Sequence, residues 1–204
     1  MINKFFEEGR PQRGFSYAQY INMMQEKAAN AEKADGPSRQ LISTNPDILN
    51  YRRTLRIEKS YSVNPGMEKL IKEINKFQLW MVLTESWCGD SAQNLPYIAK
   101  LAAMNPKIEL KILLRDQNLD IMDLYLTNGI SRSIPKLVSF DTEGNELFQW
   151  GPRPAEAQGL MSKLKSEGKE KKEYIEALHL WYGRDKGKSL ENEFLLLIGD
   201  SANK

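Results

Sequence analysis

Residues 77–91 read FQLWMVLTESWCGDS and place the only cysteine of the chain, Cys88, between an apolar run and a helical pattern. The run 77–84 is short and rich in strand-forming side chains, which is typical of a strand buried on both faces. Apolar residues then recur at helical spacing, at Leu95, Ile98, Ala99, Leu101 and Ala102. We therefore expect a buried strand, a tight turn and a helix that begins near Cys88. Pro96 lies early in this pattern and predicts a kink or a late start of the helix.

The position of Cys88 at a helix N-terminus has a chemical consequence. Free backbone N–H groups and the helix dipole favour an anion there, and a thiolate is such an anion. This setting lowers the pKa of a cysteine below its ordinary value of about 8.5. Asp90 opposes the effect, because a nearby negative charge disfavours a second one. The sequence alone leaves the sign of the net pKa shift open.

A dithiol redox site would have its second cysteine at position 91, where this chain has Ser91. With one cysteine, the chain cannot close a disulfide within itself. Ser91 has two interpretations of equal weight: it hydrogen-bonds the Cys88 thiolate across one helical turn, or it only caps the helix. For Cys88 the alternative to a reactive thiol is an inert cysteine packed as a small hydrophobe.

The two residues that flank the Cys88-Gly89 pair also allow two interpretations each. Trp87 either shields the thiol or packs on the surface beside it. Asp90 either complements the helix dipole or tunes the thiol, and the dipole interpretation needs fewer assumptions.

The chain after this helix continues to alternate between strand and helix patterns. Residues 108–114 alternate like a strand, and a short helical stretch at 119–128 follows a polar connection. Two further strands at 136–140 and 146–150, joined by the turn 141–144, predict a β-hairpin.

The order strand, Trp87-Cys88-Gly89, helix, and then Ile134-Pro135 before the last two strands resembles the thioredoxin superfamily. The resemblance covers roughly residues 63–165. It implies an α/β fold, a thioredoxin-like three-layer sandwich in which a central mixed sheet is flanked by helices. It also implies that the Ile134–Pro135 peptide bond is cis and faces Cys88. More narrowly, the chain resembles a bacterial thioredoxin-like group with a Trp-Cys-Gly-Asp motif, here without the second cysteine.

Three departures from the thioredoxin pattern limit what the resemblance implies. Ser91 replaces the resolving cysteine, Lys136 replaces a small threonine, and Val82 stands where thioredoxins carry a buried acid. A valine cannot move protons during disulfide exchange. A general protein disulfide reductase is therefore disfavoured.

Three functions remain. In the first, a monothiol thiol–disulfide oxidoreductase, Cys88 attacks a disulfide or oxidised thiol of a partner protein, and a small thiol or a second protein resolves the mixed disulfide. In the second, a non-catalytic module, the groove between the Trp87-Cys88 turn and the Ile134-Pro135 loop binds a peptide or protein without turnover. In the third, the chain resembles monothiol glutaredoxins, which hold an iron–sulfur cluster with glutathione. Asp90 stands where their motif has an aromatic residue, which makes the third function weak.

We favour the monothiol function over the binding module by a small margin. Cys88 is then the catalytic residue. Its supporting residues are Trp87, Gly89, Asp90, Ser91, Ile134 and Pro135.

Composition excludes several other classes of protein. The formal net charge of +2 and the isoelectric point near 8.5 give no electrostatic footprint for nucleic acid. Residues 1–8 lack the apolar core of a signal peptide, and no run approaches the roughly 20 apolar residues needed to span a membrane. A single cysteine fits a reducing compartment. We therefore expect a cytoplasmic protein that does not bind a membrane.

We expect neither a metal site nor a cofactor. One cysteine and one histidine, His179, cannot build a four-ligand zinc site without several carboxylates. The chain has no P-loop and no dinucleotide fingerprint. His179 lies far along the chain from Cys88, and we expect no catalytic role for it.

Helical patterns on both sides of the central region predict extensions at residues 1–62 and 167–204 around a thioredoxin-like domain at 63–166. Ser16 and Val63-Asn64-Pro65 mark expected helix starts, Asn45-Pro46 marks a turn or a helix start, and Gly36-Pro37 marks an expected helix end. The extensions either wrap the domain and enlarge its core or form a surface for a homodimer or another partner. The expected helices are 17–34, 41–59 in a less regular form, 67–76, 155–165, 172–182 and 190–198, with 183–188 separating the last two.

Overall fold

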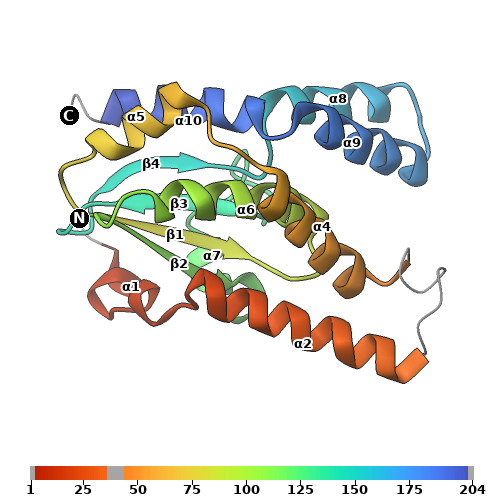
Figure 1. The fold of residues 1–204 in the computed structure, drawn as a ribbon, viewed down its shortest axis with the longest axis horizontal. Coiled ribbons are helices and arrows are strands. Elements are labelled where there is room, and N and C mark those ends of the chain that lie inside the picture. The colour runs from red at the N-terminus through yellow and green to blue at the C-terminus, as the bar shows by residue number, and fades with distance from the viewer. Residues whose placement is uncertain (1–2, 36–43, 202–204) are drawn as a thin grey trace.

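The computed structural model describes residues 3–35 and 44–201. Its sheet has the strand order β2-β1-β3-β4 (Figure 1). The central strand β1 (Gln78–Thr84) pairs in parallel with β2 (Ile108–Leu114) and antiparallel with β3 (Lys136–Phe140). The predicted hairpin joins β3 to β4 (Glu146–Trp150). The sheet is therefore mixed, and the expected α/β thioredoxin-like fold is confirmed.

Every residue of β1 is buried, because helices cover both faces of the sheet. Trp80 and Val82 face one core cluster, which includes residues of α6 (Gly89–Ala103). Leu79, Met81 and Leu83 face a second cluster with residues of α1 (Lys4–Glu7) and α7 (Leu119–Met122). The alternation of side chains along a strand produces these two cores and hence the three layers.

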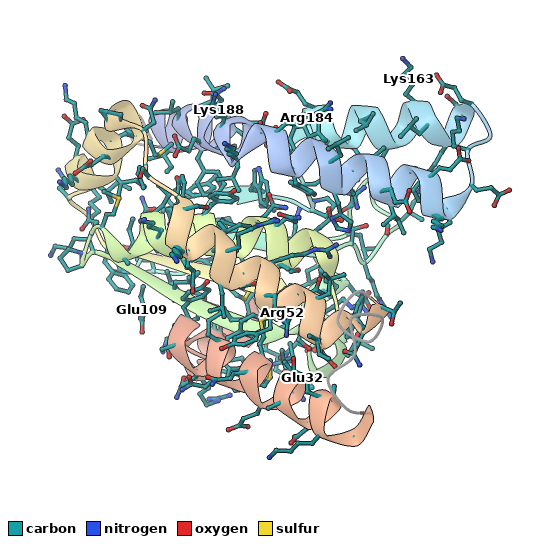
Figure 2. The ribbon with its side chains drawn as sticks, turned by 45° about the vertical axis from the view of Figure 1, so that its right-hand side comes forward. Glu32, Arg52, Glu109, Lys163, Arg184 and Lys188 are labelled. Atoms are coloured by element: carbon teal, nitrogen blue, oxygen red, sulfur yellow. The ribbon has the colours of Figure 1, made fainter. Side chains whose placement is uncertain are left out.

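Both chain extensions pack into the first of these cores. Tyr20 of α2 (Tyr17–Asp35) and Ile57 of α4 (Pro46–Ser60) belong to it, and so does Phe194 of α10 (Lys188–Ser201). At the surface, Arg52 of α4 and Glu32 of α2 form an ion pair at 3.0 Å (Figure 2). The extensions therefore enlarge the core, as the first of the two interpretations proposed. The division of the chain at 62/63 and 166/167 stays a prediction.

The helix starts follow the capping signals in the sequence. The Asn45 side chain accepts hydrogen bonds from the backbone of Asp47 at 3.0 Å and Ile48 at 3.3 Å, at the start of α4. Asn64 caps α5 (Pro65–Glu73) in the same way. Ser16 Oγ accepts from the Gln19 backbone N–H at 3.3 Å at the start of α2. The expected helix end at Gly36-Pro37 lies outside the described residues, as do residues 41–43.

Three local predictions differ from the structure. Helix α6 begins at Gly89 and continues through Pro96, so the helix does not start late, while the alternative, a kink at Pro96, stays a prediction; Pro96 is buried. Helix α7 ends at Met122 instead of reaching 128, and a turn with positive φ at Asn128 and Gly129 follows.

The third difference lies between the last two helices, where the sequence indicated a connection over 183–188. Helix α9 (Lys171–Asp185) continues to Asp185, so only Lys186 and Gly187 separate it from α10. Both of these residues have positive φ, which ends the helix sharply. The closing helix of the central region, α8 (Ala155–Ser166), agrees with the prediction.

No helix in the described parts of the chain is both long enough and apolar enough to cross a membrane.

A substitution at Phe194 tests whether α10 belongs to the hydrophobic core. Its ring lies edge-on to Trp80, Phe148 and Trp150, with centroid distances of 5.8, 6.1 and 5.7 Å. We expect Phe194→Ala to lower the free energy of unfolding by about 3–5 kcal/mol, measured by urea denaturation. The matched control Leu196→Ala, at a side chain that is 70% exposed on the same helix, should change it by less than about 0.5 kcal/mol. Equal effects of the two substitutions would contradict this packing.

Candidate functional site

Cys88 is the N-cap residue of α6, as the sequence predicted. Its side chain is buried, with 8% of the residue exposed. The sulfur lies 3.3 Å from the carbonyl oxygen of Ile134, to which the thiol donates a hydrogen bond. The Ile134–Pro135 peptide bond is cis, the isomer that the resemblance implied. The fold thus brings Cys88 together with the Ile134-Pro135 loop, 46 positions further along the chain.

Burial decides the protonation of this thiol. It raises the pKa of Cys88 above its ordinary value, and the carboxylate of Asp90 raises it further. The Ser91 side chain and the backbone N–H groups at the helix start lower the pKa, but they do not outweigh burial. The structure therefore supplies the sign that the sequence left open: the resting thiol is protonated at neutral pH.

Ser91 is fully buried and takes part in a chain of hydroxyl groups. Its Oγ accepts a hydrogen bond from Thr84 Oγ1 at 2.6 Å, and the Tyr20 hydroxyl of α2 lies close to the same Thr84. Because Ser91 also favours the Cys88 thiolate, the first of its two interpretations has support. The N-terminal extension therefore reaches the site through Tyr20, which no local sequence signal indicated.

Asp90 is held by residues from the C-terminal half of the chain. Its carboxylate forms an ion pair with Arg153, in which Nε lies 3.2 Å from Oδ2, and it accepts a hydrogen bond from the Tyr182 hydroxyl at 2.7 Å. Asn94 donates to the Tyr182 hydroxyl at 3.0 Å. Arg153 follows β4 and Tyr182 lies on α9, so no local sequence pattern indicated that either would meet Asp90.

Trp87 lies at the surface beside the thiol. It is 43% exposed, and the Arg115 guanidinium lies 4.9 Å from its ring centroid. Arg115 also donates a hydrogen bond to the carbonyl oxygen of Arg132 at 3.2 Å. Arg115 therefore connects the Trp87 turn to the loop that carries Ile134 and Pro135.

The turn before Cys88 is held by the N-terminal helices. Asn50 of α4 donates a hydrogen bond to the Ser86 carbonyl oxygen at 2.9 Å, and Lys27 of α2 donates to Ser86 Oγ at the same distance. Glu85, which is also buried, accepts from the Asp116 backbone N–H at 2.9 Å. These contacts fix the direction in which the chain enters α6.

Two departures from the thioredoxin pattern lie close to this site. Val82 is fully buried in the first core cluster, so its position offers no proton carrier. Lys136 follows the cis proline and is buried, which lowers the pKa of its ammonium group. Neither residue supplies the acid that thioredoxins place behind their cysteines.

The structure brings His179, expected to lie far from the site, to the start of α6. A Cβ atom at Gly89 would lie 3.2 Å from His179 Cε1 and 3.7 Å from Arg53 Nη1, so a larger residue there would displace the His179 ring by a few tenths of an ångström. The Nδ1 atom of His179 is buried without a hydrogen-bond partner among the described residues. Burial, followed by the charge of Arg53, lowers the pKa of His179 to about 4. His179 is thus a neutral packing group beside the cysteine motif.

Within residues 3–35 and 44–201, no group of three or more histidine, cysteine, aspartate or glutamate side chains could hold a metal ion.

The mixed sheet, the N-cap cysteine and the neighbouring cis proline define a thioredoxin-fold protein. The family model described as thioredoxin matches residues 36–167, more than half of the chain, so this chain belongs to the thioredoxin family.

Two solved structures are similar to this one. The first is an HIV epitope scaffold, with a TM-score of 0.60, 19% identity, and coverage of 92% of this chain and 94% of that chain. The second is a protein of unknown function from Pseudomonas aeruginosa, with a TM-score of 0.58, 18% identity, and coverage of 91% and 98%. Sequence identities this low show a shared fold and do not indicate a shared function. None of the curated proteins matches the sequence.

The charge of Asp90 can be tested through the thiol. Asp90→Asn removes a negative charge that disfavours the thiolate, so the pKa of Cys88 should fall towards its ordinary value. The pH dependence of the Cys88 alkylation rate, followed by intact mass, measures this shift. Glu73→Gln, an exposed charge on α5, serves as the control and should leave the midpoint unchanged. A midpoint that is the same in wild type and Asp90→Asn would show that Asp90 does not influence the thiol.

His179 makes stability depend on pH. Its pKa is about 4 in the folded protein and about 6.5 when unfolded, so the unfolded chain takes up the proton first as the pH falls. This contribution is fully present above pH 6.5 and is lost as the pH falls towards 4. In His179→Gln, the difference in free energy of unfolding between pH 7 and pH 4 should be smaller than in wild type. Equal differences in urea denaturation would contradict the assignment.

Proposed function

We propose that this protein carries out thiol–disulfide exchange through Cys88 alone. The observation that supports the proposal best is the position of the chain's single thiol, at the N-cap of α6 and 3.3 Å from the Ile134 carbonyl oxygen beside the cis proline. In this arrangement the thiol is protected until a partner approaches, since burial keeps it protonated.

The proposed reaction has two steps. The Cys88 thiolate attacks one sulfur of a partner disulfide, forming a mixed disulfide, and the released partner thiolate takes up the proton that Cys88 lost. A second thiol, from a small molecule or a protein, then attacks the mixed disulfide and returns Cys88 to the reduced state. Ser91 cannot resolve the intermediate, so the mixed disulfide persists until that second thiol arrives.

The surface around the thiol favours a protein partner over a small thiol. Trp87 is 43% exposed and Ile130, in the loop before the cis proline, is 85% exposed. Exposed apolar side chains of this size are typical of contact sites for other proteins. Arg115 spans the space between the Trp87 turn and this loop.

The cellular setting follows from the same proposal. A lone thiol that forms reversible mixed disulfides suits a reducing compartment, which agrees with the predicted cytoplasmic location. Membership of the bacterial Trp-Cys-Gly-Asp group, and the absence of nucleic-acid and membrane partners, stay predictions of the sequence. So does the homodimer that the sequence left open.

A second candidate function, a non-catalytic binding module, is favoured by the burial of Cys88 and its raised pKa. In that case the exposed residues at the thiol would bind a peptide or protein without exchange. Binding would then survive Cys88→Ser.

An aromatic disulfide that releases a coloured thiolate separates the two functions. The native protein should release one equivalent per chain and retain a stable mixed disulfide, whereas Cys88→Ser should release none. In Ser91→Cys the new thiol, one helical turn away, should displace the bound aromatic thiolate and release a second equivalent. Excess glutathione should release the bound thiolate from the wild-type adduct.

The same probe with the protein in urea provides the reference rate for an exposed thiol. If the urea-unfolded chain releases one equivalent while the native protein releases none over hours, exchange is excluded and the binding module becomes the favoured function.

A further inference from the structure

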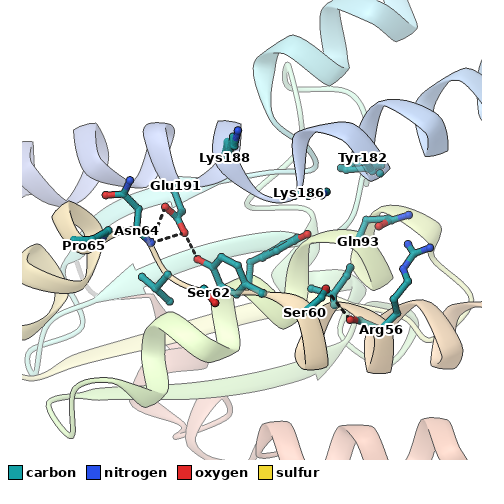
Figure 3. A pocket seen from close by; sticks show the side chains of 15 residues that line it. Arg56, Ser60, Ser62, Asn64, Pro65, Gln93, Tyr182, Lys186, Lys188 and Glu191 are labelled. Atoms are coloured by element: carbon teal, nitrogen blue, oxygen red, sulfur yellow. Dashed lines mark hydrogen bonds between the residues drawn. The ribbon is translucent and has the colours of Figure 1, made fainter.

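A cavity of about 700 Å³ lies away from the thiol, between α4, the start of α5, α6 and the junction of α9 with α10 (Figure 3). This volume is in the range of sites that hold small organic molecules. Its walls come from the N-terminal extension, the central domain and the C-terminal extension, so only the folded chain assembles it.

The rim of the cavity carries positive charge. Arg56 lies on the α4 side, and Lys186 and Lys188 lie at the α9–α10 junction (Figure 3). All three side chains belong to exposed residues, and none forms an ion pair within the described parts of the chain. The one carboxylate in the lining, Glu191, bonds to the hydroxyl of Tyr61 and to the backbone N–H of Asn64. The three cations therefore outnumber the anion and are free to meet a ligand.

The floor of the cavity contains a polar group that lacks a partner. Gln93 of α6 is only 3% exposed and lines the cavity, and its side-chain amide has no hydrogen-bond partner among the described residues. The amide faces the space of the cavity and is not among the buried unpartnered groups of the described residues, so it is available to hydrogen-bond a polar group of a ligand.

The aromatic wall of the cavity is rigid. The rings of Tyr61 and Tyr97 pack edge to face at 4.5 Å and 87°. A Cβ atom at Gly187 would lie 2.6 Å from the Tyr97 ring, so the α9–α10 turn presses directly on it. The cavity is therefore preformed, which reduces the ordering that binding requires.

We propose that this cavity binds a small organic phosphate. The phosphate group lies between Arg56 and Lys186, since guanidinium and ammonium groups together match its multiple charge and its acceptor oxygens. The organic part lies against Tyr61 and Tyr97, and a polar group on it meets the Gln93 amide. This proposal does not rest on the reactivity of Cys88.

Calorimetric titrations with inorganic pyrophosphate, AMP and adenosine test the proposal on the full chain. Pyrophosphate tests only the phosphate contacts with Arg56 and Lys186. Adenosine has the organic part of AMP but lacks its charged phosphate group. We expect saturable binding of at least one of the two anions with a dissociation constant below about 1 mM, and binding of adenosine at least tenfold weaker than that of AMP. Absence of saturable binding by both anions, or equal affinities for AMP and adenosine, would overturn the proposal.

Substitutions of the cavity residues test whether the anion binds in this cavity. The double variant Arg56→Gln/Lys186→Gln should weaken anion binding by roughly tenfold or more. Lys172→Gln is the control, because Lys172 is an exposed lysine near the other end of α9, about 20 Å from Lys186 by helix rise. If Lys172→Gln weakens binding as much as the double variant does, the attraction is non-specific and the proposal fails.

Gln93→Leu tests the floor of the cavity. Because the native amide has no partner, leucine should fill its place without lowering the free energy of unfolding, while AMP binding weakens severalfold. If the affinity for AMP is unchanged in this folded variant, the Gln93 contact is wrong.

Discussion

The burial of β1 on both faces is the constraint on which the rest of this structure depends. A strand with apolar side chains on both sides requires two covering layers, and every residue of β1 is buried. The chain meets this requirement with segments from both of its ends. Trp80 shows how: its ring packs against Phe148 from within the sheet and against Phe194 from α10. The extensions are therefore structural parts of the fold.

This arrangement also determines the chemistry of the thiol. The C-terminal half of the chain brings Tyr182 of α9, and Arg153 from the connection after β4, to Asp90. Asp90, which the sequence presented as a simple first-turn acid, is neutralised by Arg153 and fixed by Tyr182. Burial by the same surroundings outweighs the helix N-terminus and raises the pKa of Cys88. A thiol in the position of a thioredoxin nucleophile is thus held in its protonated form.

The thiol and the cavity are linked through shared neighbouring residues. Tyr182 lines the cavity and also donates a hydrogen bond to Asp90. Gln93 lies on α6, the helix that Cys88 caps. The C-terminal extension therefore contributes to two sites at once, one with a nucleophilic sulfur and one with free cations. The cavity depends on the α9–α10 junction, where Gly187 lies against Tyr97 of α6.

Local patterns were sufficient to predict the strands, the hairpin, the capped helix starts and the place of Cys88 at the head of α6. These features depend on side-chain alternation and on short-range hydrogen bonds, and both act within a few residues. The sequence by itself thus determined the fold class and the location of the thiol. The pKa of that thiol, the Asp90–Arg153 ion pair, the approach of His179 to Gly89 and the charged cavity were decided only by the tertiary structure. Burial and charge act through space, and the groups that supply them here come from elements 60 to 90 positions away, as Arg153 and Tyr182 do from Asp90.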